Sequence, residues 1–167
     1  MAVVGGFETR PYKCRWLWQS VMNGRVWNLQ AHIQETTMTN LSPHQKAQTL
    51  IPLCEKALPF LHEDAVIERA QAAIREMKNW APDRNASGLP LGDLLMDESE
   101  EGLVSDEFEA RTPEIRAAIL LIGYAAAYVS WHLSRQSGEI PHTTVTDVSE
   151  ETYELALAEA DRLKLKA

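Results

Sequence analysis

The feature that most constrains the fold is an uncharged stretch over residues 117–132. One helical stripe around it consists of Ile115, Ile119, Ile122, Ala126, Val129 and Leu133, and the other sides carry Leu120, Leu121, Tyr124, Ala125, Tyr128 and Trp131. A helix that is apolar on nearly all sides is usually the buried centre of a bundle. Thr112 and Pro113 suit its N-terminus, and Gly138 ends it. The sequence therefore predicts a mainly α fold, a helical bundle around a buried central helix at 113–136.

Length, termini and cysteines indicate the class of protein. At 167 residues the chain is expected to form a single globular domain, 1–167. The uncharged stretch is shorter than the ~20 apolar residues that a membrane span needs, so we expect no membrane partner. The N-terminus lacks a basic region followed by an apolar core, as a secretory signal would have. Cys14 and Cys54 are too few for a disulfide framework. We expect a soluble, cytoplasmic protein.

Three further helices are indicated where the sequence takes on a helical period. Ser42 and Pro43 provide an N-cap and a first-turn proline, and Pro52 is expected to kink the helix that follows. A second helix follows Asp64, and a last one begins after Ser149. Their expected inward faces are Ala47, Leu50, Cys54, Ala57 and Leu61, then Val66, Ala70, Ala73, Met77 and Trp80, and then Tyr153, Ala156, Leu157, Ala160 and Leu163.

Residues 12–34 carry the pattern of a β-hairpin. Asn23-Gly24 is the dipeptide most suited to a type I′ turn, in which both central residues need positive φ. The register set by this turn gives one mainly apolar face, with Cys14, Trp16, Trp18, Trp27, Leu29, Ala31 and Ile33. The competing interpretation is an amphipathic helix through the same segment. Core packing is the favoured role of the tryptophans here, and an interface anchor is the alternative.

The charge of the chain is concentrated in one segment, residues 93–109, which holds eight acidic residues and no basic one. They are Asp93, Asp97, Glu98, Glu100, Glu101, Asp106, Glu107 and Glu109. The whole chain has 24 acidic and 16 basic residues, so its formal charge of −8 resides in this segment. A local negative field attracts basic partners and repels nucleic acid. The eight acids are therefore the candidate partner-binding residues.

The acidic segment belongs to a long connection, 81–111, with little periodicity. Connections of this length are usually functional or disordered. This one also contains apolar residues, among them Leu91, Leu95 and Leu103, so we expect it to be partly anchored on the body. Two alternatives to partner binding stay open. The acids can form a solvated loop that only keeps the protein soluble, or they can include paired carboxylates for catalysis or cation binding.

The sequence contains no motif for a known reaction. It has no His-x-x-x-His or Cys-x-x-Cys pair with the spacing of zinc ligands. The residues of His62-Glu63-Asp64 would point in different directions on a helix. Cys54 falls on an apolar stripe, where a free cysteine usually acts as a small hydrophobic residue. We therefore expect no catalytic residue, no metal site and no cofactor.

The stretch 53–80 resembles a known family. Leu53-Cys54-Glu55-Lys56-Ala57-Leu58-Pro59-Phe60, followed by an Ala-rich helix that ends Met77-Lys78-Asn79-Trp80, is similar to a pattern in small all-α immunity proteins of bacterial polymorphic toxin systems. The Ala-rich runs at 117–118 and 125–127 resemble later helices of that family. The Trp-rich N-terminus and the acidic insertion depart from it. The resemblance implies a non-enzymatic protein that binds and silences a cognate toxin in the producing cell.

The charge distribution leads to the same class of function. A concentrated acidic surface on a small domain suits an inhibitor that occupies the basic cleft of an enzyme acting on nucleic acid or nucleotides. The first hypothesis is therefore an immunity protein that neutralises a cognate toxin through its acidic residues, without binding nucleic acid itself. The alternatives are a helical adaptor or structural interaction module, and a small enzyme that uses carboxylates.

Overall fold

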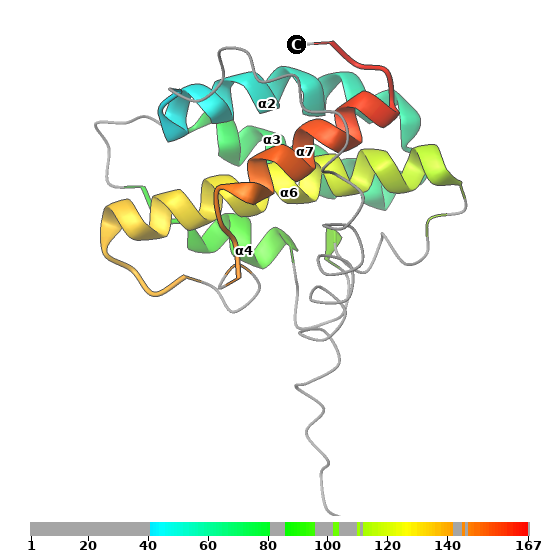
Figure 1. The fold of residues 1–167 in the computed structure, drawn as a ribbon. Coiled ribbons are helices and arrows are strands. Elements are labelled where there is room, and N and C mark those ends of the chain that lie inside the picture. The colour runs from blue at the N-terminus through cyan, green and yellow to red at the C-terminus, as the bar shows by residue number, and fades with distance from the viewer. Residues whose placement is uncertain are drawn as a thin grey trace, which may run out of the picture. The chain divides into compact units, whose positions relative to one another are not determined.

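In a computed structural model of the protein, the apolar stretch forms one 25-residue helix, α6 (Pro113–Ser137), drawn mainly in yellow in Figure 1. It begins where the Thr112 hydroxyl accepts a hydrogen bond from the Ile115 amide, 3.3 Å away. It ends at Gly138, whose φ of 73° lies in the left-handed region that favours glycine. Every residue over 117–130 is buried. The predicted central helix is confirmed, and it ends one residue later than expected.

Four more α-helices accompany α6 in the described part of the chain, which comprises residues 41–80, 86–95, 102–103, 110, 112–141, 145 and 147–166. They are α2 (Pro43–Ala57), followed by the short 3₁₀ helix η2 (Leu58–Phe60), then α3 (Asp64–Lys78), α4 (Leu89–Leu95) and α7 (Glu151–Arg162). Each of the four contacts α6 (Figure 1). The described residues contain no strand, which supports a mainly α fold. The hairpin predicted at 12–34 lies outside them.

Helix α2 starts with a capping box. The Ser42 hydroxyl accepts a hydrogen bond from the Gln45 amide at 3.3 Å, and the Gln45 side chain accepts one from the Ser42 amide at 2.8 Å. Two amides that the helix itself leaves without partners are thereby satisfied. The helix continues through Pro52, which is exposed, and ends at Ala57. Pro52 is therefore tolerated within the helix, and η2, which contains Pro59, follows directly.

The inward faces of α2, α3 and α7 follow the predicted stripes. Their buried residues include Ala47, Leu50, Cys54, Ala57 and Leu61, then Val66, Ala70, Ala73, Met77 and Trp80, and then Tyr153, Ala156, Ala160 and Leu163. Leu157 is the exception, because it is only half-buried while Leu155 is buried. Full burial of a Val, Leu, Ile or Met side chain contributes roughly 1.5–3 kcal/mol. Burial of these stripes is therefore the main contribution to the free energy that holds the helices together.

The connection at 81–111 contains a helix that the sequence pattern does not predict, α4. Leu91 and Leu95 on this helix are 1% and 0% exposed, and Leu103 farther along is 1% exposed. The expected anchoring of the connection on the body is confirmed at these residues. The helix is short and contains a proline and a glycine, both of which have low helix propensity, so no helical period could reveal it.

Gly88 allows the start of α4 to lie directly on α6. The Ser130 hydroxyl donates a 2.6 Å hydrogen bond to the Gly88 carbonyl, and the Glu139 carboxylate accepts one from the Gly88 amide at 3.2 Å. A Cβ atom on residue 88 would lie 2.3 Å from the Ser130 carbonyl oxygen and 2.4 Å from Ser134 Oγ. The backbone of a buried helix cannot move away cheaply, so only glycine fits this contact.

We expect Gly88→Ala to lower the free energy of unfolding by about 1–3 kcal/mol, the usual cost of overpacking a core. Urea denaturation followed by circular dichroism measures this change. Gly123→Ala on α6 is the matched control, because a Cβ atom there meets nothing within 4 Å and alanine has the higher helix propensity. An equal loss of stability in both variants would contradict the close-contact explanation.

Helix α6 is long and apolar enough to cross a membrane by length and composition alone. However, 89% of its apolar 18-residue window is buried inside the protein. Burial by neighbouring helices is the ordinary situation of a core helix in a folded domain. The arrangement of α2, α3, α4 and α7 around α6 therefore accounts for its apolar composition without a membrane.

Candidate functional site

The structure describes one of the eight acidic residues that the sequence selects for partner binding. This residue is Asp93, which is exposed on α4 between the buried Leu91 and Leu95. The other seven, Asp97, Glu98, Glu100, Glu101, Asp106, Glu107 and Glu109, lie outside the described residues. The acidic segment therefore begins on a helix that is packed against the central helix of the bundle.

Two buried leucines flank the densest group of acids in the sequence. Leu95 precedes the acids at 97–101 and Leu103 follows them, and both side chains are almost fully buried. Fixing both ends of a short chain segment limits the conformations open to the segment. The core thus holds the chain on both sides of these acids.

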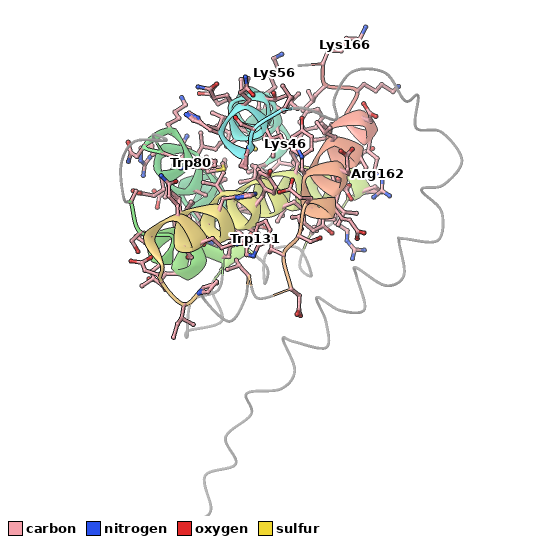
Figure 2. All side chains as sticks on the ribbon, turned by 60° about the vertical axis from the view of Figure 1, so that its left-hand side comes forward. Lys46, Lys56, Trp80, Trp131, Arg162 and Lys166 are labelled. Carbon is pink, nitrogen blue, oxygen red and sulfur yellow. The ribbon has the colours of Figure 1, made fainter. Side chains whose placement is uncertain are left out.

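A second group of polar side chains lies where α2, α6 and α7 meet, and it centres on the Glu150 carboxylate. Glu150 Oε2 accepts hydrogen bonds from Lys46 Nζ at 2.8 Å and from the Tyr128 hydroxyl at 3.1 Å. His132 Nε2 lies 3.2 Å from Glu150 Oε1. Lys46, which Figure 2 shows between α2 and α7, also lies 5.0 Å from the centroid of the Tyr153 ring. Lys46, Tyr128, His132 and Glu150 are called the Glu150 junction below.

Aromatic rings enclose this junction on the side of α3. The His132 ring stacks on Trp80, with 6.2 Å between the centroids and 14° between the planes. Trp80 stacks in turn on His44 at the start of α2, with 5.2 Å between the centroids. Tyr128 meets the His132 ring edge-on at 4.5 Å. These contacts leave the His132 side chain only 13% exposed.

The surroundings of the junction set the charge of its members. Burial lowers the pKa of His132 below its ordinary value of 6.5, although the nearby carboxylate acts in the opposite direction. Burial opposes ionisation of Glu150 too, but the hydrogen bonds from Lys46 and Tyr128 outweigh it and lower the pKa of this carboxyl. Burial and the carboxylate together raise the pKa of Tyr128. Near neutral pH the Glu150 carboxyl is therefore ionised, while the Tyr128 and His132 rings are neutral.

This arrangement joins three helices through two hydrogen bonds and an ion pair to one carboxylate. The Glu150 carboxylate already accepts hydrogen bonds from a lysine and a tyrosine, which makes it a weak base. The sequence analysis missed the junction because its residues come from three separate helices. One signal was present in the sequence, since Tyr128 and His132 are one helical turn apart and place two polar groups on one side of a mainly apolar helix.

The other residues that the sequence analysis weighed for chemistry occupy ordinary structural positions. Among the described residues no group of three or more His, Cys, Asp or Glu side chains could hold a metal ion. His62, Glu63 and Asp64 are all exposed. Cys54 is 0% exposed, and burial raises the pKa of its thiol well above the usual range. Cys54 therefore belongs to the core, as predicted.

Comparison with known proteins decides the family. The family model described as Immunity protein Imm6 matches residues 45–162, which is more than half of the 167-residue chain. The chain belongs to the Imm6 immunity protein family. No curated protein and no solved structure shows significant similarity to this Imm6 protein.

Membership of the Imm6 family confirms the resemblance drawn from residues 53–80, which lie inside the matched region. It assigns the chain to proteins whose role is to neutralise a toxin. The match spans α3, α4, α6 and α7 and most of α2. The bundle and the Glu150 junction thus both lie within the part of the Imm6 protein that defines its family.

The low pKa of His132 makes the stability of the Imm6 protein depend on pH. The folded protein binds a proton at this buried ring less readily than the unfolded chain does. The unfolding free energy should therefore keep its full value above about pH 6.5 and decrease as the pH falls toward the folded-state pKa. Urea midpoints measured at several pH values test this expectation.

The matched variants for this test are His132→Phe and His62→Gln. Phenylalanine keeps a flat ring against Trp80 but cannot be protonated, so His132→Phe should be less sensitive to pH over this range. His62 is exposed, and its replacement should preserve the wild-type dependence. His132→Phe with the full wild-type dependence would show that the acid sensitivity arises elsewhere.

Proposed function

We propose that this Imm6 protein is a non-enzymatic inhibitor, which binds its cognate toxin in the cytoplasm of the producing cell through the acidic segment at 93–109. The toxin surface that fits this segment is basic, as in the cleft of an enzyme that acts on nucleic acid or nucleotides. One observation carries the proposal: the whole formal charge of the chain is placed in one segment, which the core holds at Leu95 and Leu103. Family membership supplies the toxin-neutralising role.

Physical reasons favour the acidic segment as a binding surface. A cluster of like charges raises the local potential and increases the rate at which an oppositely charged partner arrives, by about 10- to 10³-fold at low salt. Close charge pairs across an interface can also slow dissociation. Both effects suit an inhibitor that has to capture a toxin before the toxin reaches its target.

A binding role is favoured over catalysis by the chemistry of the described residues. Cys54 has a buried thiol with a raised pKa, which makes it a poor nucleophile. The Glu150 carboxylate is occupied by Lys46 and Tyr128. The buried Glu159 carboxylate receives two hydrogen bonds of 3.0 Å from Arg162. These polar groups serve the fold, so the acidic segment is left as the more suitable surface for a partner.

The direct test neutralises the four acids between the anchoring leucines. Asp97→Asn combined with Glu98→Gln, Glu100→Gln and Glu101→Gln should leave the unfolding free energy almost unchanged. Association with the cognate toxin should slow at least about tenfold at low salt. The wild-type association rate should also fall steeply with added salt, because exposed charges are screened beyond about 10 Å at 0.1 M.

The matched control neutralises four acids elsewhere on the surface. Glu63, Glu68, Glu154 and Asp161 are all exposed on the described helices or beside them. Glu159 is unsuitable because it is buried and paired with Arg162. The control variant should associate nearly as fast as the wild type. Equal and small effects from both sets would reduce the acidic segment to a solubility feature and favour an adaptor role.

A further inference from the structure

One end of the bundle presents a second surface, formed by the C-terminal turns of α6. In both views α6 runs past the start of α7 (Figures 1 and 2), and most residues over 131–137 are not fully buried, unlike those over 117–130. Trp131 and Arg135 lie on the same side of these turns, one helical turn apart. Trp131 is partly exposed and Arg135 is exposed. The Arg135 guanidinium carbon lies 4.8 Å from the centroid of the Trp131 ring.

Large exposed apolar side chains gather at this end of the bundle. Leu89 is 40% exposed and Ile140 is 87% exposed, and no other large apolar side chain of the described residues is classed as exposed. Their segments are joined, because the Glu139 carboxylate accepts hydrogen bonds from the Ser87 hydroxyl at 2.9 Å and from the Gly88 amide at 3.2 Å. Leu89, Trp131, Arg135 and Ile140 are called the α6-end surface below.

The two parts of the α6-end surface occupy neighbouring faces of α6. The segment before Leu89 lies on Ser130 and Ser134. These serines directly precede Trp131 and Arg135, and successive residues of a helix are about 100° apart around its axis. The aromatic–arginine pair is therefore beside the face on which the start of α4 lies.

Arg135 lacks the intramolecular ion pair that three other described basic residues form. Lys46, Lys78 and Arg162 each form an ion pair with a carboxylate of the protein. Within the described part of the chain, Arg135 forms no such pair. Its guanidinium is instead held flat by an aromatic ring, which leaves the N–H groups at its edge able to bind an external carboxylate in a bidentate manner.

The Trp131–Arg135 pair is supported from behind by the Glu150 junction. The Trp131 ring meets the His132 ring edge-on, with 4.6 Å between the centroids. His132 is in turn fixed by its stack on Trp80 and by its contact with Glu150. Binding to a surface whose side chains are already held in place costs less conformational entropy. Tryptophan and arginine in such positions are also the residues most enriched in interface hot spots.

We infer that the α6-end surface is a second contact for the toxin, at which Arg135 binds an exposed Asp or Glu side chain set in an apolar patch of that protein. This inference rests on the proposed toxin-binding function and adds a contact of opposite charge to it. Leu89, Trp131 and Ile140 supply the apolar surroundings, and the guanidinium supplies the directed hydrogen bonds. A partner then has to match a negative segment and a positive point at once, which raises specificity.

A protein carboxylate fits this surface better than a nucleic-acid phosphate. Both groups can accept two hydrogen bonds from an arginine. Surfaces that bind nucleic acid, however, use many lysine and arginine side chains to neutralise successive phosphates. The chain as a whole carries a formal charge of −8, which repels a polyanion. Single carboxylates on a folded partner do not meet this repulsion to the same degree.

The test measures binding of the catalytically inactivated cognate toxin to the wild type and to single variants. Arg135→Met keeps the apolar stem over Trp131 and should weaken binding about tenfold or more, mainly through faster dissociation. Arg135→Lys should restore binding only in part, because an ammonium group lacks the planar fork. Ile140→Ser should also weaken binding. Arg75→Met, at an exposed arginine on α3, is the matched control.

Each outcome bears on this inference or on the proposed function separately. If the wild type fails to bind the toxin, the proposed function fails, and this inference fails with it. If the acidic variant binds weakly but Arg135→Met and Arg75→Met bind like the wild type, only the α6-end surface is excluded. Urea midpoints equal to that of the wild type show that a weakened variant is folded. Tight Arg135-dependent binding of a single-stranded DNA oligonucleotide would replace the carboxylate with a phosphate and overturn the inference.

Discussion

Between Ala117 and Ser130, α6 has no side that can face water, so the described fold depends on covering this helix completely. Four helices pack on it, and each does so through small or apolar residues. The hydrophobic effect is not directional and cannot by itself fix how these helices are arranged. Directional contacts supply that information, among them the hydrogen bond between Ser130 and Gly88 and the clamp on Glu150. Burial thus provides the driving force, and a few polar contacts select the geometry.

The same polar contacts connect the core to the surfaces that we propose for binding. Glu150 joins α2, α6 and α7. His132, which contacts Glu150, also packs against Trp131 and so holds the Trp131 ring in place on the outside of α6. On the other side of α6, the start of α4 packs closely on α6 at Gly88, and α4 carries Asp93, the first acid of the acidic segment. Asp93 and the Trp131–Arg135 pair therefore lie on helices that pack against the rest of the bundle. Contacts made by these described residues require little rearrangement on binding.

Local patterns predicted the helices well, because caps, periodicity and burial are encoded within a few turns. The bounds of α6 and the stripes of α2 and α3 followed from Thr112-Pro113, Gly138 and apolar spacing. Helix α4 was missed, because burial of Leu91 and Leu95 overrides its weak propensity. The Glu150 junction was missed for a different reason, since Lys46 and Glu150 meet only after three helices have packed. The prediction for the acids beyond Asp93 concerns residues outside the described part, so it stays a prediction.

Because Leu95 and Leu103 are buried, sequence changes between them can accumulate without affecting the packing of the helices. A substitution, insertion or deletion between them changes a stretch whose ends are fixed in the core, and longer loops add little entropic cost. The helices outside this interval need not repack when the interval changes. The stretch between the two leucines can therefore change in length and sequence while the scaffold is retained, much as loops vary on a conserved framework in other binding proteins.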